Sequence, residues 1–183
     1  MRYHDEISIQ ARDDIGLRPF GRTDAPDLVT GLNDWQVIRW LAKVPHPYRL
    51  DHATAYLARA EHQNVDVALS DVTASCSLAI CHQDHVIGAV GLVPSTRRTG
   101  FRELGFWLSR SFWGQGIMPD AVRAVMQRAR KRGQTPLFVA GANQDNVRSQ
   151  RLIRSLGFVE DGHDDIFSTP LQRRVRIICY REF

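Results

Sequence analysis

The spacing of hydrophobic residues in the first third of the chain predicts a strand followed by helices. The strand covers residues 15–20 (IGLRPF) and is expected to continue from residues 7–11. Apolar residues then recur at three- and four-residue intervals, which is the period of a helix packed on one side. Three helices are expected: one capped by Thr23 or Asp24, a short one over residues 35–41, and one capped by Asp51 whose buried positions are Ala55, Tyr56, Leu57 and Ala60.

The middle of the chain changes to the alternation that is typical of strands. Three strands are expected, over residues 77–82, 85–93 and 101–108, with a turn at residues 83–84. Gly88 and Gly91 interrupt the second strand, which indicates a β-bulge or the close approach of another backbone. Because only short turns separate these strands, they are expected to form an antiparallel meander.

The last part of the chain alternates helices and strands. A loop over residues 109–116 leads into a helix that begins at Ile117 and is capped by Gly133. The elements expected after it are a strand at residues 135–140, a helix at 146–155 that ends at Gly157, and strands at 158–161 and 174–180. The predicted fold class is α/β: a single domain over residues 1–183, with a mixed, mostly antiparallel central sheet flanked by helices.

Composition and charge exclude several classes of protein. Of the 183 residues, 43% are hydrophobic and 24% charged, which is typical of a folded globular protein. The net charge of +4 is mild, and its tightest basic cluster, residues 128–132, stands at an expected helix end, where cations complement the helix dipole. We therefore expect no nucleic-acid partner, since such a partner needs a clustered basic face.

The cysteines and apolar runs predict the compartment. Cys76, Cys81 and Cys179 form no CxxC pair and have no histidine at metal-ligand spacing, which favours free thiols and no metal. No apolar run approaches the ~20 residues that span a bilayer, and the first residues lack a signal-peptide core. The expectation is a cytoplasmic protein with no membrane partner.

The strongest chemical signal is the loop WGQG at residues 113–116, between an expected strand and an expected helix. The first amides of a helix lack an intrahelical acceptor, and glycines let an anion approach the backbone. The loop is no Walker motif, because no Lys-Ser/Thr follows it, and it lacks the third glycine of the dinucleotide fingerprint. Taken alone, it is as typical of a structural turn as of an anion site.

This loop belongs to a set of four segments, which in chain order are LRPF, ELGFWL, WGQGIM and NQDNVRSQRLIRSLGF. In order and spacing they resemble the GCN5-related N-acetyltransferase (GNAT) superfamily, and most of all its branch of ribosomal-protein-alanine N-acetyltransferases. The resemblance covers nearly the whole chain. It implies acetyl-CoA as cosubstrate, an amine as acceptor, and chemistry that needs no metal.

The resemblance also implies which residues bind acetyl-CoA. Strand backbone would pair with the pantetheine arm as an added strand does, loop amides would hold the pyrophosphate, and residues after the next strand would bond to pantetheine or to neighbouring backbone. These residues are Phe106, Trp107, Leu108, Trp113, Gly114, Gln115, Gly116, Asn143, Asn146 and Ser149. For Asn146 the alternative is capping of the following helix.

Two positions depart from the family pattern. Ser111 stands where Gln or Arg often precedes the glycines, with Arg110 beside it, so the backbone is expected to hold the phosphates. Ile153 occupies the position of a tyrosine that protonates the leaving thiolate in many members. Ser149, near the thioester sulfur, or a water is therefore expected to take that role.

Acetyl transfer also needs a neutral amine. An α-amino group has a pKa of about 8, so its neutral form costs about 1 kcal/mol at pH 7, whereas that of lysine costs several. Glu103 is the first candidate for the general base, and strand alternation places it on one face with Gly105 and Trp107. The alternative is a solvated edge charge or a partner for Arg102. A backbone amide near Leu108 would hold the oxyanion.

The acceptor stays open between a protein N-terminus, an aminoglycoside, a polyamine and another small amine. Residues 24–63 are expected to form one wall of its site, with Trp35, Trp40, Tyr48 and Tyr56 either lining that wall or lying in the core. Asp161, His163, Asp164 and Asp165 are interpreted as an acidic surface turn that can attract a cationic acceptor. A different class, an acyl-CoA sensor without turnover, also fits the sequence, and nothing in it sets an oligomeric state.

Overall fold

A computed structural model describes residues 9–60, 65–83, 85–131 and 137–183, and within them a single eight-stranded sheet forms the centre of the fold. Its strand order is β1-β2-β3-β4-β5-β6-β8-β7, and only β5 and β6 are parallel. The strands are β1 (Ile9–Arg12), β2 (Ile15–Pro19), β3 (Cys76–His82), β4 (His85–Pro94), β5 (Phe101–Leu108), β6 (Leu137–Asn143), β7 (Phe158–Ser168) and β8 (Arg173–Glu182). The predicted mixed, mostly antiparallel sheet is confirmed.

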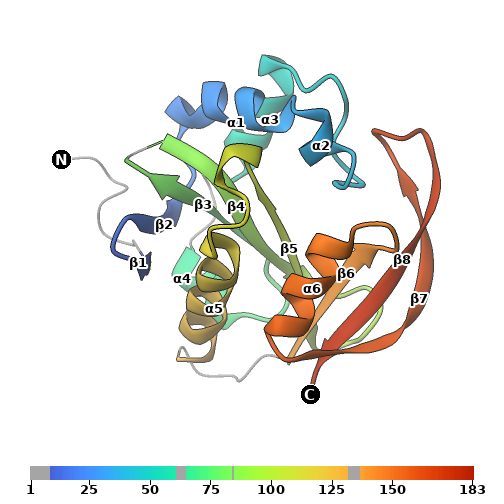
Figure 1. The fold of residues 1–183 in the computed structure, drawn as a ribbon. Coiled ribbons are helices and arrows are strands. Elements are labelled where there is room, and N and C mark those ends of the chain that lie inside the picture. The colour runs from blue at the N-terminus through green and yellow to red at the C-terminus, as the bar shows by residue number, and fades with distance from the viewer. Residues whose placement is uncertain (1–8, 61–64, 84, 132–136) are drawn as a thin grey trace.

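Helices pack on both faces of this sheet. They are α1 (Ala25–Leu32), α2 (Trp35–Ile38), α3 (Leu50–Ala60), α4 (Val65–Ser70), α5 (Ile117–Arg130) and α6 (Val147–Ser155). Figure 1 shows α1, α2 and α3 gathered at the top of the view and α5 and α6 lower down. Neighbouring residues of a strand point to opposite faces, so Ala89 of β4 packs in one core with α1 and α3, while Val90 packs in a second core with α5 and α6.

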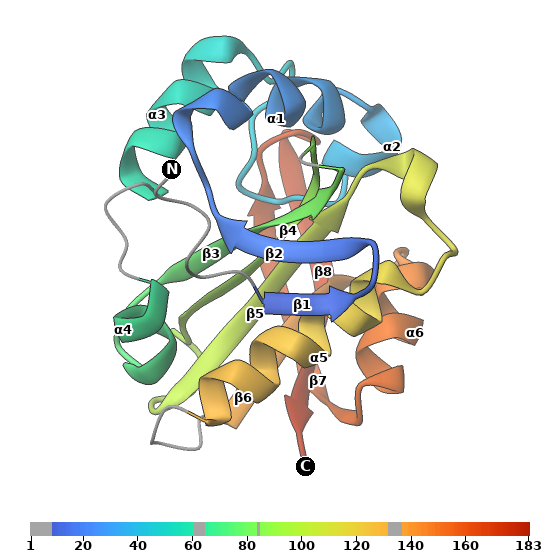
Figure 2. The same cartoon turned by 90° about the vertical axis from the view of Figure 1, so that its left-hand side faces the viewer.

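The first strand differs from the prediction. Residues 9–12 do not continue β2 but form β1, which pairs antiparallel with it, with Ile9 opposite Leu17. The two consecutive aspartates at residues 13–14 occupy the reversal, where Asp is favoured because its side chain bonds to nearby backbone. Figure 2 shows the resulting β1–β2 hairpin beside α5.

Helices are present where the first third predicts them, but α2 ends at Ile38 and not at residue 41, and one assignment of buried positions is wrong. Asp24 is the N-cap residue of α1, although its carboxylate bonds to Arg18 and not to the helix. In α3 the buried residues are Ala53, Leu57 and Ala60, and Ala55 is exposed. The spacing of four and three residues follows the helical period, whereas position 55 lies on the opposite side. The sequence did not predict α4, because its text, VDVALS, alternates as a short strand does.

The two C-terminal strands are longer than predicted. The segment interpreted as an acidic surface turn lies within β7, where His163 pairs with Ile178 and Asp164 with Ile177 of β8, so that interpretation is wrong. Charged residues occupy both faces of β7 here, which hides the alternation by which a strand is recognised. The predictions that involve Asp84, Gly133 and Thr135 lie outside the described residues.

The feature that positions the site is a separation of β5 from β6. These strands pair only from Phe101 opposite Leu137 to Leu104 opposite Ala140. Beyond that point β5 pairs only with β4, as far as Leu108, and β6 only with β8, as far as Asn143. Figure 1 shows the two strands leaning apart above their common base. Among the described residues, one side of the second half of β5 therefore has no strand partner.

A bulge in β4 supports the end of β5. Gly88 pairs with Ile80 but Val86 pairs with Cys81, so Ile87 is an extra residue in β4. The carbonyl of Ile87 accepts a hydrogen bond of 2.7 Å from the amide of Ser109. A Cβ at Gly88 would stand 2.4 Å from the carbonyl oxygen of Trp107. For Gly88 the predicted bulge and close backbone approach are confirmed, whereas Gly91 lies in regular pairing with its nearest atom 3.6 Å from an added Cβ, so the prediction is wrong there.

Candidate functional site

The glycine loop places two residues in the left-handed backbone region. Gly114 has φ of 78° and Gly116, the N-cap of α5, has φ of 76°. A Cβ at either position would meet no atom within 4 Å, so the loop requires glycine for its backbone conformation and not for lack of space. Gly116 offers no side chain to cap α5, which leaves the first amides of this 14-residue helix for an external acceptor.

Side chains of the loop and its neighbours hold it in place. The Trp113 indole donates to the carbonyl oxygen of Leu108 at 2.7 Å, and the Gln115 amide group donates to that of Ser111 at 3.1 Å. From β1, the guanidinium of Arg12 donates to the carbonyl oxygen of Gln115 at 2.9 Å. Trp113 and Gln115 thus use their side chains to fix the loop, and what they offer a ligand is backbone.

A cation that the sequence reasoning missed stands beside this loop. The guanidinium of Arg148, in the first turn of α6, lies 4.8 Å from the ring centre of Trp113. Its signal in the sequence was present but ambiguous, because Arg148 is one of three arginines in α6 at three-residue spacing. The stacking fixes a positive charge next to the predicted phosphate site.

Successive residues of β5 direct their backbone hydrogen-bonding groups alternately towards β4 and towards β6. The Ser109-to-Ile87 bond continues the antiparallel ladder, in which Trp107 is paired with Ala89. Since hydrogen-bonded pairs recur every second residue, Trp107 directs its amide and carbonyl to β4. The backbone amide and carbonyl of Phe106, and the backbone amide of Leu108, therefore face the opening between β5 and β6. The side chain of Trp107 packs over Gly31 of α1, where a Cβ would stand 2.7 Å from its ring.

The residues predicted beyond β6 sit at the start of α6. Asn146 is the N-cap of that helix, since its side-chain oxygen accepts from the Ser149 amide at 3.2 Å, so the capping alternative is confirmed. Asn143 ends β6 and accepts from the Asp145 amide at 2.8 Å. The buried Gln150 donates to the carbonyl oxygens of Asn143 and Gln144, which joins strand to helix. Ser149 is half-buried in the first turn.

Glu103 lies on the face of the sheet opposite to α5. Its carboxylate accepts a hydrogen bond of 2.8 Å from Arg97, and its side chain is 32% exposed. It is neither an edge charge, because β5 is a central strand, nor a partner of Arg102. Arg102 is fully buried on the other face and donates to the carbonyl oxygens of Leu69 and Ala74. Both alternatives for Glu103 are therefore wrong.

The aromatic residues of the first third divide between core and surface. Tyr48 is buried, and burial raises its pKa to about 12. Tyr56 packs edge-on against Phe20 and bonds to Ser77 at 2.7 Å, so both tyrosines belong to the core. Trp35 is 39% exposed and lies against His46. Of the four candidates, Trp35 and the half-buried Trp40 remain for a wall of the site.

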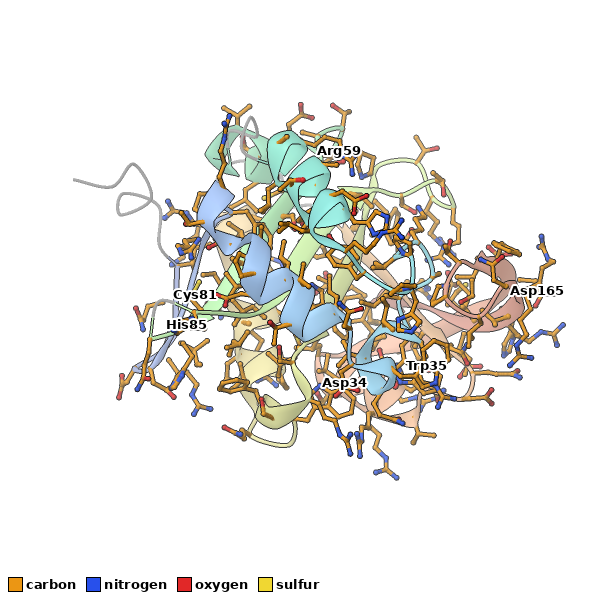
Figure 3. The ribbon with its side chains drawn as sticks, turned by 90° about the horizontal axis from the view of Figure 1, so that it is seen from above. Asp34, Trp35, Arg59, Cys81, His85 and Asp165 are labelled. Carbon is orange, nitrogen blue, oxygen red and sulfur yellow. The ribbon has the colours of Figure 1, made fainter. Side chains whose placement is uncertain are left out.

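Two pockets flank the central strands. The larger, of about 610 Å³, lies between α1 and the glycine loop and is lined by Asp27, Asp34, Ser109 and Arg110 among others. Figure 3, seen from above, shows Asp34 and His85 on the side of α1 away from Arg59. The smaller, of about 380 Å³, lies over β6 and β8 and is lined by Arg97, Asp161 and Cys179 among others.

The segment after α2 contacts the β7–β8 hairpin. The amide of Thr169, just past β7, donates to the carbonyl oxygen of Ala42 at 2.7 Å. Within the described ranges no group of three or more His, Cys, Asp or Glu side chains is placed to hold a metal, and Asp161 is instead paired with Arg98 and Arg181. No helix in those ranges is long and apolar enough to cross a membrane.

The described strands and helices form an α/β fold in which β5 and β6 separate above a short parallel base, and β5 leads into a glycine loop at the start of α5. The sequence profile of the Acetyltransferase (GNAT) domain matches residues 14–159. The chain belongs to this family.

Known proteins agree with that assignment. The Ribosomal-protein-serine acetyltransferase of Escherichia coli (strain K12) is 29% identical over 83 residues, which are 45% of this chain and 46% of that protein. The chain spans about half the length of the curated relatives it matches. Among solved structures, a probable acetyltransferase superposes with a TM-score of 0.81 at 18% identity, over 97% of this chain and 99% of that one. The microcin C7 self-immunity acetyltransferase MccE, in complex with acetyl-CoA and AMP, superposes with a TM-score of 0.75 at 18% identity. The match covers 94% of this chain and 93% of that one.

Proposed function

We propose that this protein is an acetyl-CoA-dependent N-acetyltransferase that moves the acetyl group directly to a primary amine, either a protein N-terminus or a small-molecule amine. The observation that carries the proposal is the continuous path from the unpaired side of β5 to the glycine loop. Along it, strand backbone is followed by helix-start amides, which is the order in which pantetheine and pyrophosphate occur in CoA. A relative solved with acetyl-CoA supports the same ligand.

The residues present fit this ligand. Phe106 and Leu108 offer backbone groups on the open side of β5, while the backbone of Trp107 bonds to β4 and its side chain packs against Gly31 of α1. The pyrophosphate would be held by the amides of residues 114–116, with Arg148 as a nearby cation. Asn143 and Asn146 keep the start of α6 in place beside the pantetheine path, and Ser149 would lie near the sulfur.

In this proposal the residues of the chain transfer protons from the amine and to the leaving thiolate, and they orient the thioester. When bound, acetyl-CoA supplies the acetyl group as a thioester. Glu103 would accept the proton of the attacking amine, directly or through a water, and a backbone amide near Leu108 would hold the carbonyl oxygen. Ile153, at the position of the family tyrosine, is fully buried in the core of α5 and α6, so Ser149 or a water would return a proton to the sulfur.

The alternative of an acyl-CoA sensor makes a different prediction for the purified protein. It should be incubated with acetyl-CoA and a panel of peptides with free N-termini, aminoglycosides, polyamines and small amines. Release of CoA thiol, together with a mass increase of one acetyl group on an acceptor, supports the enzyme. Binding of acetyl-CoA without thiol release across the whole panel would overturn it and favour the sensor.

A further inference from the structure

The guanidinium of Arg97 joins three strands on the face that carries Glu103. Arg97 precedes β5, and its two terminal nitrogens bond to different partners: Nη2 donates to Glu103 at 2.8 Å, and Nη1 donates to the sulfur of Cys179 in β8 at 3.2 Å. Between them it crosses β6 at Gly141, where an added Cβ would stand 3.4 and 3.5 Å from the two nitrogens. These are ordinary contact distances, and the nearest neighbour of that Cβ would be Cδ1 of Ile177 at 3.2 Å, so only a side chain larger than a methyl group would compete with the guanidinium for space.

This ion pair is partly shielded from water. The side chains of Arg97 and Glu103 are 23% and 32% exposed, so solvent screens their charges less than those of a fully exposed pair. The Cys179 thiol adds no second anion, because burial raises its pKa. Asp161 and Asp164 also act on this region, but Asp161 is neutralised by Arg98 and Arg181. The charge at Glu103 is therefore compensated chiefly by Arg97.

The compensation matters because an amine reaches the enzyme largely as a cation. At pH 7 about one α-amino group in ten is neutral, but only about one lysine side chain in 2,500. A lone carboxylate attracts an ammonium ion and so favours the protonated form of any acceptor. A carboxylate that is already paired with a guanidinium offers a cation little net attraction, while its free lone pairs still accept a proton from a neutral amine.

On the basis of the proposed function, we propose that Arg97 is a specificity-determining residue: by neutralising Glu103, it selects acceptors that arrive as neutral amines. The substrate class that this favours is the α-amino group of a peptide, and the classes that it disfavours are lysine side chains and polyamines. Arg97 acts through Glu103 and on the charge of the acceptor, and needs no contact with acetyl-CoA.

The test uses the full chain and two peptides of one sequence, one with a free N-terminus and no lysine, the other blocked at the N-terminus and carrying one lysine. In R97Q the ratio of the KM for the lysine to the KM for the α-amine should fall about tenfold, because the unpaired carboxylate of Glu103 then binds the lysine cation. R97K keeps the charge and should restore the ratio. R98Q removes the neighbouring arginine, which bonds to Asp161 and not to Glu103; Arg181 still pairs with Asp161, so the ratio should stay unchanged.

A permanent cation gives a second readout that a loss of structure does not produce. A peptide with a trimethylated N-terminus cannot be acetylated, and as a competitive inhibitor it should bind R97Q about tenfold more tightly than the unaltered protein. If R97Q does not fold, G141V replaces it, because a valine there displaces the guanidinium from Glu103 and should shift the ratio in the same direction.

An equal loss of activity on both peptides in R97Q, with unchanged inhibition by the trimethylated peptide, would overturn the role of Arg97. Failure of the proposed function looks different, since the unaltered protein would then acetylate neither peptide. In that case tighter binding of the trimethylated peptide to R97Q, measured by calorimetry, still tests the electrostatic part of the proposal.

Discussion

The indole nitrogen of Trp113 lies 2.7 Å from the carbonyl oxygen of Leu108, to which it donates a hydrogen bond. Leu108 is the last residue of β5, and Trp113 stands at the start of the WGQG loop. The bond therefore fixes the loop proposed to hold the pyrophosphate relative to the strand proposed to pair with pantetheine. One side chain thus holds the two parts of the proposed ligand site at a set distance.

Replacement of Trp113 by phenylalanine should weaken acetyl-CoA binding about five- to tenfold. Phe retains an aromatic face for Arg148 but loses the hydrogen bond, whose net value is about 1 kcal/mol. Calorimetric titration measures the change. W35F, in a tryptophan that is 39% exposed and is a candidate for the acceptor wall but not for the acetyl-CoA path, is the control and should bind acetyl-CoA normally. An unchanged affinity in W113F would show that the bond does not organise the site.

Replacement of Glu103 by glutamine should lower kcat about 10²- to 10³-fold while acetyl-CoA affinity stays within twofold. Gln preserves the size of the side chain and its bond from Arg97 but cannot accept the proton of the amine. Steady-state kinetics and calorimetry separate the two effects, and E160Q, in an exposed residue of β7, is the control. If E103Q keeps more than half of the activity, the general base is another group.

Replacement of Arg102 by methionine should lower the free energy of unfolding strongly and leave acetyl-CoA binding unchanged. The Arg102 guanidinium is fully buried, and burial lowers its pKa; its hydrogen bonds go to main-chain carbonyls of α4, the α4–β3 loop and β4. R102M leaves these carbonyls without a donor, which should reduce the free energy of unfolding by about 2–4 kcal/mol. Urea denaturation measures this, with R98M as the control. A loss below about 0.5 kcal/mol would contradict a structural role.

Ionisation of the Asp14 carboxylate should make the stability of the protein depend on pH. Arg12 donates a hydrogen bond to this carboxylate, which lowers the pKa of Asp14. A group whose pKa falls on folding stabilises the protein above its unfolded pKa, about 4, and loses that contribution as the pH drops through the folded value. D14N should therefore be less stable than the unaltered protein at pH 6, and the difference should shrink towards pH 3.

Denaturation with urea at both pH values checks this prediction. The matched control is D13N, which alters the adjacent carboxylate and leaves the bond between Arg12 and Asp14 in place. The effect of D14N is expected to be small, because Asp14 lies at the surface. A difference of the same size at pH 6 and pH 3 would show that ionisation of Asp14 does not contribute.

The sequence predicted the local parts of this fold well. The loop at residues 113–116 and the helix that follows depend on glycines and on apolar spacing within one segment, and both are confirmed. The same holds for Asn146, whose preference for a helix start is a local property. By contrast, the sequence predicted only the start of β7, at residues 158–161, because what makes the charged residues after it a strand is pairing with β8.

The sequence did not predict the relationships that join distant segments. Arg97 and Cys179 are 82 positions apart, and their contact over Gly141 depends on the order in which β5, β6 and β8 lie in the sheet. Strand alternation placed Glu103 on the correct face, but the partner expected for it, Arg102, is the adjacent residue and so points to the other face. Alternation identifies the face, whereas the partner on that face follows from the tertiary fold.

The most direct test of the central claim is the dissociation constant of acetyl-CoA for G116D measured beside that for G100D. Both glycines have a left-handed backbone, with φ of 76° and 81°, and open space at the Cβ, but Gly100 lies in the turn before β5. The two substitutions therefore add the same strain and the same charge. G116D should bind acetyl-CoA at least fiftyfold more weakly, because its carboxylate occupies the proposed phosphate site, and G100D should bind normally. Equal affinities in the two variants would contradict the placement of acetyl-CoA on this loop.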